Sequence, residues 1–203
     1  MFGLAVAIVP LVLLAGCGSD PKAPGTTAPP GFTVFDEDKA GFSVAVPANW
    51  RDIPLSDDDS EFNGTLNDLR IENPKLGTAL VLARVARNNL AKMFAVDNEG
   101  TSMVNLSVDK PEEKTLDEII AVTKPALTGD GVGATELTEE AVTLPAGPAV
   151  RLRFKLPVST DDGVVVVDEV QYYLLKDGKA YILTVISGDP SLAATIAETL
   201  RIR

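Results

Sequence analysis

Histidine is absent from this chain of 203 residues, and cysteine occurs once, at Cys17. Without histidine there is no Ser-His-Asp or Cys-His catalytic arrangement and no histidine metal site. A single cysteine excludes an internal disulfide, a Cys-x-x-Cys redox pair and a zinc ribbon. We therefore expect a protein that is not an enzyme and that holds no metal or cofactor.

Basic residues are also scarce, since 18 Lys and Arg stand against 29 Asp and Glu and give a net charge of −11. Nucleic-acid binding depends on cations that meet phosphates, so we expect no nucleic-acid partner. Aromatic residues make up only 5% of the chain. That low content gives little support to a cleft that stacks sugars or bases.

The first sixteen residues carry no charge and form an almost unbroken apolar run, which ends in LAGC at residues 14–17. As a helix, residues 2–15 would reach roughly 21 Å, short of a hydrocarbon core of about 30 Å. This length is typical of a signal peptide, with an uncleaved signal anchor or a core helix as the alternative. The LAGC ending resembles the bacterial lipoprotein box, whose cysteine receives diacylglycerol and becomes the first mature residue. The resemblance implies lipidation of Cys17 and a lipid anchor on the outer, extracytoplasmic face of the cell membrane.

A stretch rich in proline and glycine follows the cysteine. Between Gly18 and Gly31 it contains four prolines and no large apolar residue. Such a stretch cannot fold alone, and proline keeps it extended. We therefore divide the chain into a signal peptide at 1–16, a lipidated cysteine and tether at 17–31, and a single globular domain at 32–203.

The N-terminal half of the domain shows strand patterns. Apolar alternation over residues 42–46, followed by Pro47 and Trp50, predicts a strand with one face in the core. Further strand candidates are residues 69–72, 78–86 and 102–108.

Two helices have clear starting signals. Thr115 and Glu118 form a capping box, and Pro125 should kink or end the helix that begins there. Its apolar face is predicted to hold Leu116, Ile119, Ile120 and Thr123. The final helix is capped by Asp189 with Pro190 at its first position, and its core stripe is Leu192, Ile196 and Leu200.

The C-terminal half predicts two hairpins. Asp177-Gly178 between apolar strands is typical of a type I′ turn, which pairs Leu174 with Tyr181, Tyr172 with Leu183 and Val170 with Val185. A three-residue loop at 161–163 would then pair Phe154 with Val170, Leu152 with Tyr172 and Lys155 with Glu169. The fold predicted from these elements is α+β, an antiparallel sheet packed by at least two helices.

Arg151, Arg153 and Lys155 alternate with apolar residues along one predicted strand, and we call them the basic stripe. The stripe is a candidate docking face for an acidic partner. A solvated strand face, paired with neighbours such as Glu169, is the alternative.

Two other groups suggest ligands less strongly. From Asp59 the acidic run at 57–64 matches a calcium loop up to its sixth position, but Arg70 stands where a bidentate glutamate is needed. We interpret the run as a solvated acidic loop. The aromatic side chains Trp50, Tyr172 and Tyr173 could line a pocket, with core packing as the alternative, above all for Tyr172.

The segment GFSVAVPANW at residues 41–50 resembles the opening of PsbP-like domains. Together with the lipoprotein box, the tether, the mid-chain helix, the hairpins and the terminal helix, it resembles the actinobacterial LpqN/LpqT lipoproteins. The resemblance implies an α-β-α sandwich around an antiparallel sheet. It also implies a binding or assembly protein with no common catalytic residues.

Two functions therefore stay open. The first is a membrane-anchored, non-catalytic, extracytoplasmic module, expected to be a monomer, that binds or assembles with a protein partner. The second is a carrier or sensor of a small apolar ligand such as a lipid. The carrier needs a cavity of several hundred Å³, whereas a fully packed core would exclude it.

Overall fold

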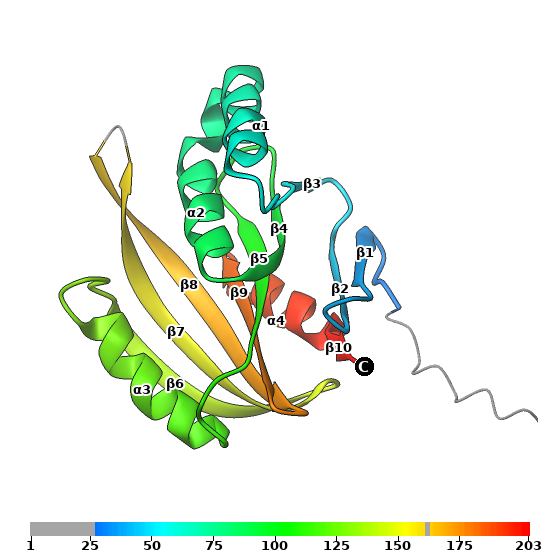
Figure 1. The fold of residues 1–203 in the computed structure, drawn as a ribbon, viewed down its shortest axis with the longest axis vertical. Helices are drawn as coiled ribbons and strands as arrows, with labels where there is room; N and C mark the ends of the chain where they lie inside the picture. The colour runs from blue at the N-terminus through cyan, green and yellow to red at the C-terminus, as the bar shows by residue number, and fades with distance from the viewer. Residues whose placement is uncertain (1–26, 161–162) are drawn as a thin grey trace, which may run out of the picture.

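The computed structural model describes residues 27–160 and 163–203. Figure 1 shows their arrangement. The strands are β1 (Phe32–Glu37), β2 (Phe42–Pro47), β3 (Arg51–Asp52), β4 (Ala91–Val96), β5 (Met103–Asp109), β6 (Thr135–Leu144), β7 (Gly147–Thr160), β8 (Gly163–Lys176), β9 (Lys179–Ile186) and β10 (Arg201–Ile202). The helices are α1 (Asp59–Glu72), the 3₁₀ turn η1 (Pro74–Leu76), α2 (Gly77–Asn88), α3 (Leu116–Thr128) and α4 (Pro190–Thr199).

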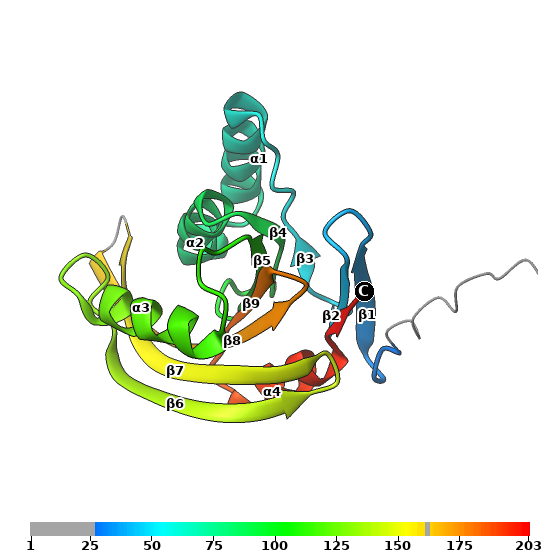
Figure 2. The same cartoon turned by 60° about the horizontal axis from the view of Figure 1, so that its bottom comes forward.

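The strands form two antiparallel sheets. The large sheet has the order β3-β4-β5-β9-β8-β7-β6, and the small sheet has the order β1-β2-β10. Helices α1, α2 and α3 lie on one face of the large sheet, and α4 lies on the other (Figure 2). None of the helices in the described part of the chain is long and apolar enough to cross a membrane. The predicted α+β class is confirmed.

Apolar side chains gather in three clusters, which together lie on both faces of the large sheet. The α4 cluster joins α4, the small sheet and one face of β8 and β9 around Tyr172. The α2 cluster joins α1 and α2 to the sheet around Phe94, and the α3 cluster joins α3 to the sheet around Leu152 and Phe154. The last two lie on the same face of the sheet but remain separate clusters.

The predicted N-terminal caps of α3 and α4 are confirmed. The Thr115 hydroxyl accepts a bond of 3.2 Å from the Glu118 amide, and the Glu118 carboxylate accepts one of 3.1 Å from the Thr115 amide. Asp189 accepts the Ser191 amide at 2.9 Å. Pro125 does not end α3, which continues to Thr128. Because this proline lies in the last turn, it removes little of the helical hydrogen bonding.

The prediction of strands at 69–72 and 78–86 is wrong, since both segments are helical. The second segment is rich in alanine and leucine, which are strong helix formers. Its buried residues Ala79, Leu80, Ala83 and Ala86 recur at helical spacing.

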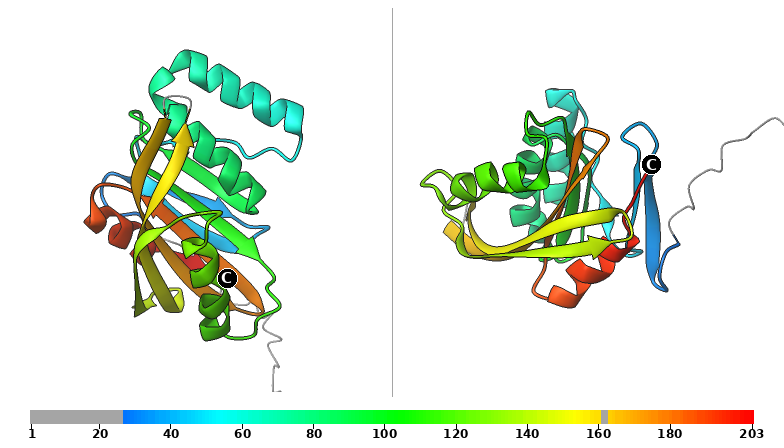
Figure 3. Two further views of the ribbon diagram at one scale, coloured as in Figure 1. Left: turned by 90° about the vertical axis from the view of Figure 1, so that its left-hand side faces the viewer. Right: turned by 90° about the horizontal axis from the view of Figure 1, so that it is seen from below.

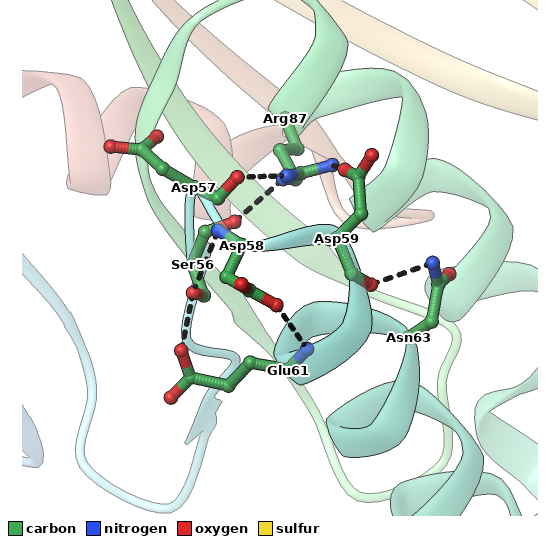
Figure 4. Close-up of polar contacts among 7 residues, drawn as sticks. All are labelled: Ser56, Asp57, Asp58, Asp59, Glu61, Asn63 and Arg87. Carbon is green, nitrogen blue, oxygen red and sulfur yellow. Dashed lines mark hydrogen bonds and ion pairs between the residues drawn. The ribbon is translucent and has the colours of Figure 1, made fainter.

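The acidic run is the start of α1 and not a solvated loop (Figure 4). Asp58 caps the helix by accepting the Glu61 amide at 2.8 Å. Arg87 from α2 reaches back to this turn, where it donates to the carbonyls of Ser56 and Asp57 at 2.7 and 2.9 Å and pairs with Asp59 at 2.7 Å. The carboxylates therefore serve the helix start and its contact with α2.

The two hairpins differ in how well they were predicted. The β8–β9 register is confirmed in all three predicted pairs, and Asp177 and Gly178 have φ values of 51° and 70°, as a type I′ turn requires. The β7–β8 register is shifted by one residue, because Thr160 pairs with Gly163 and leaves two residues between the strands.

The shift moves β7 side chains to the opposite face from the one predicted. Leu152 and Phe154 belong to the α3 cluster, whereas Val170 and Tyr172 belong to the α4 cluster. Lys155 lies opposite Asp168 and not opposite Glu169. Alternation alone could not select the register, because both faces of these strands are buried.

A pair of cysteine cross-links tests this register. On a Cys17→Ser background, Lys155→Cys with Asp168→Cys should form a disulfide on oxidation, because directly opposed residues have the required separation. Lys155→Cys with Glu169→Cys should stay reduced, because these residues face opposite sides of the sheet. Non-reducing electrophoresis with thiol titration distinguishes the pairs. If only the second pair formed a disulfide, Lys155 would lie opposite Glu169, as the sequence predicted, and the observed register would be contradicted.

Candidate functional site

Between α2 and α3 the large sheet is uncovered, and a groove of about 500 Å³ lies there. The two helices stand on the same side of the sheet with α4 on the opposite side (Figure 3, right). Strands β5, β9, β8 and β7 form the floor of the groove. The groove thus occupies the space between the α2 cluster and the α3 cluster.

The walls of the groove are mainly apolar. They carry Leu82, Val85 and Leu90 from α2 and the turn after it, Leu127 and Val132 from α3 and the loop after it, and Phe154 and Leu156 from β7. Val85, Leu90 and Val132 are 48, 50 and 40% exposed. Three large apolar side chains therefore meet solvent at the rim of one groove, a grouping typical of a ligand site.

The floor, by contrast, carries a row of polar side chains that crosses three strands. Asn105 of β5 lies opposite Thr184 of β9, which lies opposite Gln171 of β8. Glu169 and Tyr173 flank Gln171 along the same face of β8. All five residues line the groove, so its base offers amide, hydroxyl and carboxyl groups beneath apolar walls.

A short chain of hydrogen bonds joins three of these side chains. The hydroxyl of Tyr173 donates to Gln171, and the Gln171 amide donates to the Glu169 carboxylate at 2.6 Å. Glu169 is only 5% exposed. Its burial raises its pKa to about 7, against a smaller opposing effect of the Gln171 bond. Burial and the nearby Glu169 charge also raise the pKa of Tyr173.

The chemistry of the groove comes from its apolar walls and its polar floor. Within residues 27–160 and 163–203, no three Asp, Glu, Cys or His side chains come together as a metal site. The groove offers apolar contact along its walls and hydrogen bonding at its base. A ligand with an apolar body and an uncharged polar group matches both surfaces.

The polar row was missed from the sequence, although a signal for it exists. Asn105, Thr184 and Gln171 each lie within a mainly apolar strand, and Glu169 and Gln171 lie two residues apart. Alternation on β8 places both on one face. The sequence did not predict that β5, β9 and β8 pair side by side, and this pairing brings the polar residues into one row.

The basic stripe does not form a free docking face. All three residues lie on the α4 side of the sheet, where Arg151 pairs with Glu140 and Lys155 pairs with Glu136 at 2.8 Å. Arg153 has no ion-pair or side-chain hydrogen-bond partner among the described residues, and its Nε is buried without an acceptor. Of the three stripe residues, Arg153 is thus the one without an ion pair among the described residues.

The three aromatic candidates do not gather in one pocket. Tyr172 is 2% exposed in the α4 cluster, against which Trp50 packs. Tyr173 points to the opposite face and lines the groove. Core packing is thus confirmed for Tyr172. The predicted lipidation site, Cys17, lies outside the described residues.

The raised pKa of Glu169 predicts a specific pH dependence of stability. The folded carboxyl holds its proton up to a pH of about 7, whereas the unfolded one loses it near 4.5. Stability from this group is therefore present below pH 4.5 and is lost as the pH rises to 7, by about 3 kcal/mol in total. Glu169→Gln should remove this loss. Urea unfolding of the wild type and of Glu169→Gln between pH 4.5 and 8 measures this loss. If the two unfolding free energies differed by the same amount at every pH, the burial of the Glu169 charge would be contradicted.

Comparison with known proteins identifies the fold but no sequence relative. No protein-family profile matches the chain, and no curated protein is similar to it in sequence. Its structure is similar to the solution structure of cyanobacterial PsbP (CyanoP) from Synechocystis sp. PCC 6803, with a TM-score of 0.50 and 15% identity. The match covers 94% of this chain and 99% of that one. An antiparallel sheet packed by helices on both faces, together with this match, gives the chain a PsbP-like fold.

Proposed function

We propose that this protein is a membrane-anchored lipoprotein whose PsbP-like domain binds a small amphipathic ligand in the groove between α2 and α3, without catalysis. The ligand is a lipid or a comparable molecule with an apolar body and a neutral polar group. Of the two functions left open by the sequence, carrier and protein-binding module, the groove favours the carrier or sensor.

The main support for this proposal is the groove itself. A volume of about 500 Å³ lies within the range of ligand sites, and a carrier requires such a cavity. Its exposed rim, Val85, Leu90 and Val132, would be buried by the apolar part of a ligand. Burial of apolar area contributes roughly 25 cal/mol per Å², so covering this rim favours binding.

The floor supports the neutral polar group. Asn105, Thr184 and Gln171 supply donors and acceptors in a row, and hydrogen bonds there would offset the cost of burying a ligand's hydroxyls or carbonyls. A carboxylate or phosphate would lose its hydration there without a cation to pair with, because none of the described lysines or arginines lines the groove. The electrostatics therefore favour an uncharged head.

The proposed location follows from the N-terminal segment. The LAGC ending at residues 14–17 supports acylation of Cys17, and the proline-rich tether supports a domain held away from the outer face of the cell membrane. An LpqN/LpqT-type lipoprotein has this order of signal, anchor, tether and PsbP-like domain. A groove held beside a membrane has direct access to amphipathic ligands.

Two exposed valines provide a matched test of the groove. Val85 of α2 is 48% exposed at the rim, whereas Val122 of α3 is 55% exposed and does not line the groove. In a Cys17→Ser chain, Val85→Asp should weaken binding of the neutral fluorescent dye Nile red at least tenfold, because it places a charge against the apolar body of the dye. Val122→Asp should leave binding unchanged.

Fluorescence titration measures both affinities, and thermal unfolding checks that each exposed substitution leaves stability within about 0.5 kcal/mol. Equal dye affinity in all three proteins would show that the groove is not the binding site.

The proposed lipid anchor is tested at Cys17, the single cysteine that could be acylated. Cys17→Ser should abolish acylation and release the protein from the membrane fraction, because residues 2–15 are too short to span the bilayer as a helix. Membrane fractionation and intact mass spectrometry give the two readouts. Retention of the variant in membranes at the wild-type level would refute the lipoprotein assignment.

A further inference from the structure

Strands β7 and β8 extend beyond the strands that flank them (Figure 1). Pairing of β6 with β7 reaches only Lys155, and pairing of β9 with β8 reaches only Glu169. Residues 156–160 and 163–168 therefore form a two-stranded ribbon, which we call the β7–β8 arm. Along the arm, none of the described strands pairs with β8 on the side opposite β7.

This free edge presents unpaired backbone groups. In an antiparallel ladder, alternate residues direct their N–H and C=O groups to alternate neighbours. Val170 pairs with Val185 of β9, and the Asp168 carbonyl accepts the last bond on this side, from the Ser187 amide at 3.4 Å. By the same alternation, Val166 and Val164 direct their backbone groups to the open side.

The side chains of the arm do not protect this edge. Val164, Val165 and Val166 are 67, 42 and 61% exposed, and no charged side chain stands among them. Soluble proteins normally shield a free edge with lysine, proline or a bulge. A row of exposed valines with unpaired backbone groups is instead the surface to which an extended chain adds.

A second cavity lies where β9 leaves the sheet at the inner end of this edge. It has a volume of about 330 Å³, and charged side chains of both signs line it: Arg153 and Lys155 with Glu136, Asp168 and Glu169. Arg153 has no ion partner among the described residues, and its buried Nε has no acceptor. The neighbouring Lys155 is already paired with Glu136 at 2.8 Å. A buried donor without an acceptor is costly, and a carboxylate would satisfy Arg153 best.

We propose that the free edge of β8 binds an extended segment of a partner protein as an added strand, with a carboxylate of that segment bound to Arg153. An extended peptide offers backbone donors and acceptors to Val164 and Val166, which a lipid does not offer. A second copy of this chain is a poorer occupant, because each copy carries a net charge of −11 and the two would repel. Phe154 and Glu169 line both this cavity and the groove, but the added strand would lie along the edge of the arm, where Val164 and Val166 do not line the groove.

Selection of displayed random dodecapeptides against the full chain tests the proposal. The expected peptides alternate apolar and polar residues and carry Asp or Glu at one fixed position. Synthetic copies of the best peptide, each N-methylated at one residue, should lose binding at least tenfold at alternate positions and retain it at the positions between. This alternation identifies strand addition without altering the protein. Recovery of no binding peptide, or a helical pattern of sensitivity, would overturn the proposal.

Two substitutions then locate the site. Val166→Pro removes a backbone donor at the free edge and should abolish binding, with circular dichroism confirming the fold. The wild type should bind the peptide with Glu at the fixed position at least tenfold more tightly than the same peptide with Gln, and Arg153→Gln should bind the two about equally. The control Arg84→Gln changes an exposed arginine on α2 and should keep the preference for Glu. An undiminished preference in Arg153→Gln, or self-association in sedimentation that Val166→Pro abolishes, would contradict a heterologous strand with a carboxylate.

Discussion

Strand β8 packs apolar side chains against α4 on one face and presents polar side chains to the groove on the other. The strand register decides which residues lie on which face. Val170, Tyr172 and Leu174 point to α4, whereas Glu169 and Gln171 point to the groove. The Asp177-Gly178 turn sets the pairing with β9. A slip of one residue would bury the polar residues beneath α4 and place tyrosine and valine on the groove floor.

The polar face of β8 separates two apolar clusters that would otherwise meet. A core built only for stability would place apolar residues at Asn105, Thr184 and Gln171 and join the α2 and α3 clusters into one. Here the two clusters stay separate, each anchoring its own helix. The Lys124–Glu139 ion pair, at 2.8 Å, further ties α3 to β6. The gap between the helices is therefore supported from both sides.

Local signals made much of the fold predictable. The capping box at Thr115, the Asp189 cap with Pro190, and the Asp177-Gly178 turn each depend on residues within four positions, and the structure shows all three. Helix α2 was mistaken for a strand because its apolar run is nearly continuous, so periodicity gave no decision. Its alanine and leucine content was the better guide.

The candidate groove was less accessible to prediction. Its floor depends on β5, β9 and β8 lying side by side in a non-sequential order, which no local pattern specifies. The face on which the basic stripe lies was mispredicted for a related reason. Its alternation was read correctly, but the face to which it points depends on a loop length that differed by one residue. Motifs were thus predictable where chemistry and geometry are local, and uncertain where they depend on register between distant strands.

The last residues of the chain close the structure against its first strands. Strand β10 pairs with β2, and Arg203 forms ion pairs with Asp36 and Asp38. Helix α4 just before it covers the core, with Ile196, Ala197 and Leu200 fully buried. Strand β2 pairs with the neighbouring β1 on one side, and its other side is completed only by β10 from the far end of the domain. The small sheet therefore joins the two ends of the described domain, so loss of either end would leave an edge of β2 unpaired and part of the α4 cluster uncovered.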